Sequence, residues 1–173
     1  GSMPTTFAEQ CRQALENVKA IVTDAGLSTQ HVVYTQVYLQ DVNNYAEMDR
    51  VFGEFFPQTP PARAVLGVAR VPDPPIQISA IAVRDLADRR TVFPPGHKLE
   101  GTASPGMLTH DLLFISSMAG SDPETGKVPE DAAAQVDLAL NRLQAVVKAA
   151  GLELSNMVFV NPYLTSAIPM RIM

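Results

Sequence analysis

The sequence contains one cysteine among 173 residues, Cys11, so no disulfide can form within the chain. A chain without disulfides suits a reducing compartment, and we expect a cytoplasmic location. No apolar run approaches the roughly 18 residues that a membrane-spanning helix needs. The first residues also lack the charged-then-apolar pattern of a secretory leader. Membrane proteins and disulfide-stabilised secreted domains are therefore not expected.

Basic residues are few. Lys and Arg number 13 against 18 Asp and Glu, giving a net charge of −5. This balance argues against nucleic acid as the main partner, because binding a phosphate backbone needs a basic surface. The three histidines, His31, His97 and His110, lack metal-ligand spacing, so no metal site is expected. The hydrophobic content of 46% instead indicates a globular chain, long enough for one ordinary domain or two small ones.

Hydrophobic periodicity predicts alternating helices and strands. Thr5 or Thr6 can cap the first helix, and Glu9 completes a capping box if Thr6 is the cap. Cys11 falls on the apolar stripe of this helix and is expected to be packed rather than reactive. Helices are expected over residues 7–25, 45–56 and 130–150, and strands over 31–39, 63–71, 76–83, 110–116 and 156–164.

The chain repeats itself at an offset of 125 residues. Residues 8–39 align with 133–164 without a gap, and 12 of the 32 aligned positions are identical. Any two helix–strand units share a general pattern, but here the helix end, the turn and the strand all match. Two partial copies of one unit are therefore expected. Copy one, residues 4–86, carries the C-terminal two-thirds of the unit, and copy two, residues 91–173, carries the N-terminal two-thirds.

Arg63 follows two prolines in the segment Pro60-Pro61-Ala62-Arg63, at the start of a predicted strand. A guanidinium presents a planar fork that binds a carboxylate through two hydrogen bonds. Such a charge-assisted hydrogen bond contributes about 1.5–3 kcal/mol. Arg63 is therefore a candidate carboxylate-binding residue. The alternative is an ordinary arginine paired with a nearby acid.

The stretch VFGEFFPQTPPARAVLGVARVPDPPIQISAIAVR, residues 51–84, resembles the C-terminal signature of the RidA family, also called YjgF or L-PSP. The segments around 14–42 and 112–151 resemble earlier parts of the same pattern. The resemblance implies an α+β, chorismate-mutase-like fold: a mixed β-sheet with two helices packed on one face, present here as two partial copies. It also implies homotrimers or pseudo-trimers with ligand clefts between subunits.

The resemblance further implies hydrolysis of 2-imino or 2-enamino acids to 2-oxo acids and ammonia, without a metal or organic cofactor. Arg63 would hold the substrate carboxylate, the backbone near Val65 would add a contact, and Ser117 could line the cleft. A family glutamate that handles water falls on Gln77. Arg63 and Gln77 are thus the expected catalytic residues, and Arg63, Val65 and Ser117 are expected to contact the substrate.

Three positions depart from the family pattern. Gln77 can hydrogen-bond a water but cannot take its proton. Val65 replaces a frequent cysteine, and Ala103 replaces a frequent tyrosine. These departures keep open a non-catalytic module that binds carboxylate ligands or serves assembly. Ribonuclease activity, attached to some family members, is the least favoured reading because the chain is acidic and lacks a paired general acid and base.

Neither copy is whole, which leaves two arrangements open. The strands around 91–118 can fold back and complete the sheet of copy one in permuted order, or the chain can be a piece of a longer tandem protein. Both arrangements leave unpaired strand edges and apolar helix faces in a lone monomer, so we expect oligomerisation.

Overall fold

A computed structural model describes residues 3–96, 101–122 and 125–165 of the chain. Residues Gly1–Ser117 form one compact unit, and residues Met118–Met173 form a second. Among the described residues, no helix is long and apolar enough to cross a membrane.

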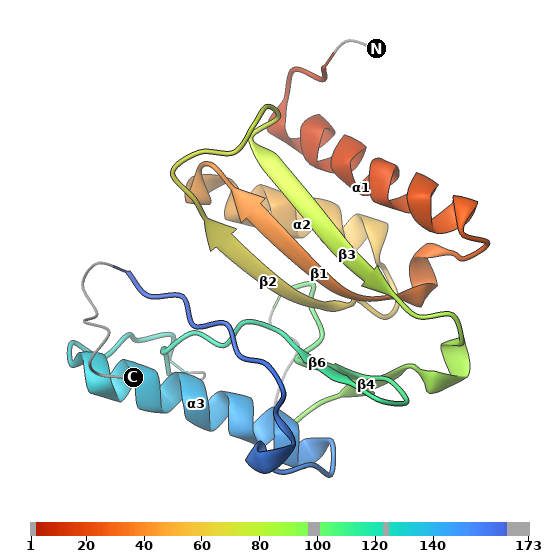
Figure 1. The fold of residues 1–173 in the computed structure, drawn as a ribbon. Helices are drawn as coiled ribbons and strands as arrows, with labels where there is room; N and C mark the ends of the chain where they lie inside the picture. The colour runs from red at the N-terminus through yellow and green to blue at the C-terminus, as the bar shows by residue number, and fades with distance from the viewer. Residues whose placement is uncertain (1–2, 97–100, 123–124, 166–173) are drawn as a thin grey trace. The chain divides into compact units, whose positions relative to one another are not determined.

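A three-stranded mixed sheet organises the first unit (Figure 1). Its central strand β1, Val32–Leu39, pairs in parallel with β2, Ala62–Gly67, and antiparallel with β3, Ile76–Ala82. Helices α1, Phe7–Asp24, and α2, Tyr45–Phe55, cover one face of this sheet. The expected mixed sheet with two helices on one face is confirmed. Their shared core consists of Cys11, Leu15, Val22, Val32, Val37, Leu39, Met48, Val51, Phe52, Phe56 and Ile76.

The start of α1 shows how the sequence fixes this helix. The backbone N–H of Glu9 donates to the Thr6 hydroxyl at 3.3 Å, and the backbone N–H of Thr6 donates to the Glu9 carboxylate at 3.2 Å. Thr6 rather than Thr5 is therefore the cap, and the capping box is present. Gly26 follows the helix with φ of 76°, a left-handed conformation that glycine adopts without strain.

A second sheet completes the first unit. It contains β4, Arg90–Val92, β5, Gly106–Leu108, and β6, Leu113–Ile115, paired antiparallel in that order. Met107 of β5 packs with Val33 and Ala62 of the first sheet, and the rings of Tyr34 and Phe114 stack at 6.0 Å. The strands expected around 91–118 thus fold back onto predicted copy one, but the expectation that they complete its sheet is wrong. They form a sheet of their own rather than further strands of the first sheet. Short 3-10 turns lie at Thr29–His31, Val42–Asn44 and Leu86–Asp88.

The second unit contains helix α3, Ala132–Ala149, and a short 3-10 turn, Leu154–Asn156. Asp131 caps α3 by accepting a hydrogen bond from the backbone N–H of Ala134 at 2.9 Å. The strand expected over residues 156–164 is wrong, because the described part of this segment pairs with no other strand. Pro162, which aligns with Val37 of the central strand β1, has no backbone N–H to donate to a neighbour.

The two predicted copies differ most in how far other helices and strands cover their apolar side chains. Leu15 and Val33 are fully buried in copy one, whereas their counterparts Leu140 and Val158 are 53% and 85% exposed. The covering elements of copy one are α2 and the strands that flank β1, and the described part of copy two has no such elements. The copy boundaries at 4–86 and 91–173 remain a prediction from repeated sequence, and the compact units divide at Ser117.

Candidate functional site

Arg63 lies near the beginning of β2, where the chain enters the sheet from Pro60 and Pro61. Two residues directly after β6 form hydrogen bonds with the backbone of Arg63. The Arg63 N–H donates to the Ser116 hydroxyl at 2.8 Å, and the Ser117 N–H donates to the Arg63 carbonyl at 3.1 Å. The Ser116 hydroxyl in turn donates to the Ser104 carbonyl at 2.7 Å. Residues of predicted copy two therefore contribute directly to the surroundings of Arg63.

The Arg63 side chain is buried, with only 2% of its surface exposed. Its Nη2 donates to the Asp49 carboxylate, and its Nη1 donates to the Thr102 hydroxyl at 3.1 Å. The guanidinium carbon lies 4.7 Å from the centre of the Phe52 ring, a cation–π contact. Three groups from α2 and the 101–104 segment therefore fix the plane and direction of the guanidinium.

Asp49 is the charged partner of Arg63 and keeps 18% of its side chain exposed. Its Oδ1 also accepts from the Thr102 hydroxyl at 2.7 Å and from the Thr102 backbone N–H at 3.2 Å. Burial opposes the charge of this carboxylate, but the hydrogen bonds from Arg63 and Thr102 outweigh burial and lower the pKa of Asp49. Asp49 is therefore ionised at neutral pH.

Gly101 allows the 101–104 segment to approach Asp49 closely. Its φ is 66°, and a β-carbon at this position would stand 3.0 Å from the Asp49 Oδ2. A side chain here would both strain the backbone and press on the carboxylate.

Thr35 of β1 is the register partner of Arg63 and is fully buried. Paired residues on neighbouring strands point to the same face of a sheet, so Thr35 and Arg63 share the face covered by the helices. The Thr35 hydroxyl has no hydrogen-bond partner among the described residues. An unsatisfied buried hydroxyl is unfavourable and is a common feature of sites that bind a ligand or a water.

Gln77 lies away from Arg63. The β1 partners of Arg63 and Gln77 are Thr35 and Tyr38, and the two side chains come from strands on opposite sides of β1. Strand geometry separates their backbones by about 14 Å, and the odd register difference puts the side chains on opposite faces. Within one chain, the structure does not bring the two expected catalytic residues together.

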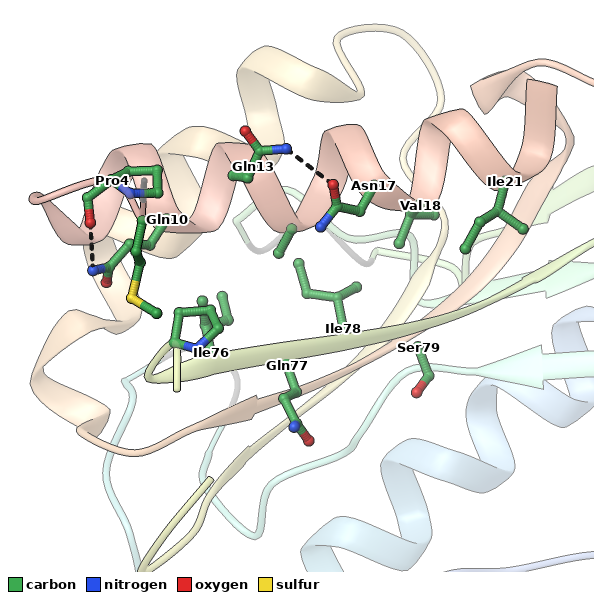
Figure 2. Close-up of a pocket in the computed structure, with 13 residues that line it drawn as sticks. Pro4, Gln10, Gln13, Asn17, Val18, Ile21, Ile76, Gln77, Ile78 and Ser79 are labelled. Atoms are coloured by element: carbon green, nitrogen blue, oxygen red, sulfur yellow. Dashed lines mark hydrogen bonds between the residues drawn. The ribbon is translucent and has the colours of Figure 1, made fainter. Parts of the chain in front are cut away.

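Gln77 instead borders an open groove of about 750 Å³ between α1 and β3. Figure 2 shows Ile78 pointing toward α1, whereas Gln77 and Ser79 point away from that helix. Gln13 and Asn17 of α1 are among the residues that line the groove and are joined by a 2.9 Å hydrogen bond (Figure 2). Arg63 does not line this groove.

Val65 lies two residues after Arg63 on β2 and packs against the core under the helices. Ser117 contacts Arg63 through its backbone, as described above, so both residues lie beside Arg63. Their predicted roles in substrate binding remain predictions.

The histidines and Cys11 are the other residues whose side chains could bind a metal or react. His31 accepts from the backbone N–H of Ser28 at 3.0 Å, and His110 is exposed beside Asp111. His97 lies outside the described residues. Over the part of the chain that the structure describes, no group of three metal-binding side chains occurs. Cys11 is fully buried, and burial raises the pKa of its thiol to about 12 although the Arg63 charge opposes this shift.

Sequence reasoning missed Asp49 and Phe52 as neighbours of Arg63. Both lie on α2, where they are three residues apart and so share one side of the helix. The only sequence signal was an acidic residue directly beside the apolar stripe of this helix. The pairing of Asp49 with Arg63 depends on how α2 crosses the sheet, which no local pattern specifies.

Comparisons with known proteins identify the family of this chain and several relatives. The endoribonuclease L-PSP family model matches residues 1–84 and 98–172, two segments that are compatible with the two predicted copies. A 2-iminobutanoate/2-iminopropanoate deaminase of Escherichia coli is 46% identical over 88 residues, covering 49% of this chain and 69% of the relative. A RutC family protein of Pyrococcus horikoshii is 45% identical over 78 residues, covering 44% of this chain.

The aligned part of this chain spans only 62% of the Pyrococcus relative's length. The solved YjgF gene product of Escherichia coli is 44% identical, covers 49% of this chain and 70% of its own, and has a TM-score of 0.48. Because the family model covers most of the sequence in two segments, the chain belongs to the endoribonuclease L-PSP family, the family also known as RidA.

Proposed function

We propose that the protein hydrolyses 2-imino acids to 2-oxo acids and ammonia, with Arg63 as the anchor for the substrate carboxylate. The observation that carries this proposal is a buried guanidinium whose plane is fixed by Phe52, Asp49 and Thr102. A guanidinium held in this way can bind a carboxylate through two parallel hydrogen bonds at low entropic cost. The deaminase name of the Escherichia coli relative supports the same reaction class.

Hydrolysis of an imine mainly requires that the substrate and the attacking water are correctly positioned. Water adds through oxygen to the imine carbon and a proton goes to nitrogen, giving a carbinolamine. The hydroxyl proton passes to the amino nitrogen as the carbon–nitrogen bond breaks, so that ammonia leaves and the 2-oxo acid remains. Holding the carboxylate fixes the imine carbon relative to the attacking water. The buried Thr35 hydroxyl, beside Arg63 in register, supplies a second polar group for orienting the substrate.

A second candidate function is a module that binds carboxylate ligands or serves assembly without catalysis. It is favoured by Gln77, which lies on the opposite face from Arg63 and cannot act as a base. Binding of pyruvate without acceleration of imine hydrolysis would support this module over the enzyme.

The activity is tested with a freshly generated 2-imino acid and detection of the ammonia released. Arg63→Lys keeps the positive charge for Asp49 but loses the planar fork. We expect kcat/KM to fall by about 10–100-fold, which corresponds to loss of a charge-assisted hydrogen bond. The matched control is Arg50→Lys, the same change at an exposed position of α2. Equal rates with and without wild-type protein would contradict the proposal.

Association and location belong to the same proposal. We propose a homo-oligomer, a trimer or pseudo-trimer, that acts in the cytoplasm on a small 2-imino acid. The exposed Leu140, Val158 and Phe159 support association, since their counterparts in copy one are largely covered. Light scattering should give a mass above that of the 18.7 kDa chain, and a stable monomer would contradict association.

A further inference from the structure

The guanidinium of Arg63 already binds a carboxylate of the protein itself. Nη2 donates to Asp49, and Nη1 donates to Thr102, whose hydroxyl donates to the same Asp49 oxygen. The three side chains therefore form a closed ring of hydrogen bonds. A substrate carboxylate could bind both terminal nitrogens only after the hydrogen bonds of this ring break.

Space and charge make the two carboxylates mutually exclusive. Arg63 is 2% exposed, so its guanidinium has no open face for a second anion in this arrangement. Two carboxylates held on one guanidinium would also repel each other in a poorly hydrated setting. Asp49 is the partner able to move, because it is 18% exposed and lies on the side of a helix near the surface.

We propose that the Asp49 carboxylate is an internal competitor that sets how tightly Arg63 holds a substrate carboxylate. This inference rests on the proposed role of Arg63 as the carboxylate anchor. Substrate binding exchanges one carboxylate for another on a buried guanidinium, which avoids leaving that charge unpaired. The affinity for substrate is therefore the difference between two similar interactions, and it favours product release over tight retention.

The experiment measures pyruvate binding by calorimetry, since pyruvate is the smallest 2-oxo acid. Asp49→Asn keeps the shape and an accepting oxygen but removes the competing charge. We expect its Kd for pyruvate to be about tenfold lower than that of the wild type, the difference between a charged and a neutral hydrogen bond. Glu54→Gln removes a carboxylate from the same helix at an exposed position and should leave the Kd unchanged.

Two further variants assign the effect to Arg63. Asp49→Asn combined with Arg63→Met removes both charges and should abolish the gain in affinity. Asp49→Ala leaves the guanidinium without its acid, and pyruvate should raise its melting temperature more than that of the wild type. Circular dichroism confirms that each variant is folded.

The inference is overturned if folded Asp49→Asn binds pyruvate no more tightly than the wild type, or if the gain survives the loss of Arg63. Its failure is distinguishable from failure of the proposed reaction. If wild-type hydrolysis depends on Arg63 but Asp49→Asn gains no affinity for pyruvate, the proposed reaction stands and the competitor role of Asp49 is wrong. If Asp49→Asn gains affinity for pyruvate but the wild type does not accelerate hydrolysis, the competitor role of Asp49 stands and the proposed reaction is wrong.

Discussion

At the scale of single residues, the buried pairing of Arg63 with Asp49 links the stability of the fold to the proposed function. The sequence predicts Arg63 as a carboxylate-binding residue from its place after Pro60 and Pro61, and it leaves open an ordinary ion pair. The structure shows that ion pair, and it is buried rather than at the surface. The two readings are compatible, because the acid that pairs with the guanidinium also occupies the position proposed for a ligand carboxylate.

Removal of Arg63 is expected to destabilise the fold strongly. In Arg63→Met the partly buried Asp49 carboxylate loses its cation, and breaking a buried pair costs about 3–5 kcal/mol. Urea unfolding measures the loss. The exposed Arg50 of the same helix pairs with Glu54, and Arg50→Met should cost less than about 1 kcal/mol. Similar losses in the two variants would contradict the burial argument.

Asp49 is expected to make the stability of the protein depend on acid pH. Its pKa is lowered in the folded state by Arg63 and Thr102, so its charge stabilises the fold above the unfolded value of about 3.9. This contribution is lost as the pH falls through the lowered folded pKa. The stability difference between wild type and Asp49→Asn should therefore be constant near neutral pH and shrink below about pH 4. A difference unchanged at pH 3 would contradict the assignment.

At the scale of helices and strands, local patterns predicted the two helices and the first sheet of the first unit well. The Thr6 cap, the apolar stripe through Cys11 and Leu15, and the β-branched run of β1 each specify one element, and the structure confirms them. The same patterns failed at 156–164, because a strand exists only when another strand pairs with it. Asp49 was missed for a related reason, since its partner is 14 residues away and meets it only after α2 packs.

The packing of α1 is expected to make Cys11 unreactive. The side chain is fully buried, and burial raises the pKa of its thiol to about 12, so the reactive thiolate is scarce at neutral pH. Ellman's reagent at pH 8 should modify the folded protein very slowly and label one thiol per chain after unfolding in guanidinium. Rapid labelling of the folded protein would show that α1 opens readily from the sheet.

At the scale of the whole molecule, the sequence copies and the compact units divide differently. Most of β4 and all of β5 and β6 fall in predicted copy two, yet these strands form the second sheet of the first unit, and Ser116 after β6 accepts a hydrogen bond from the Arg63 backbone. The repeat predicted that copy two would supply strands to copy one. The partial second copy also predicted uncovered apolar faces, and Val158 and Phe159 in the described part of the remainder are exposed.

Two fragments test this division. Residues 1–117 contain both sheets and should unfold cooperatively in urea, keeping affinity for pyruvate. Residues 1–86 contain copy one alone, without the Ser116 and Thr102 contacts to Arg63, and should be much less stable. Equal stability of the two fragments would show that the second sheet is dispensable for the first.

The most direct test of the account is a crystal structure of the protein with bound pyruvate. The account predicts the pyruvate carboxylate on the terminal nitrogens of Arg63, with the Asp49 side chain displaced from its present contact. Pyruvate bound elsewhere, with the hydrogen bonds of Arg63 to Asp49 and Thr102 intact, would contradict it.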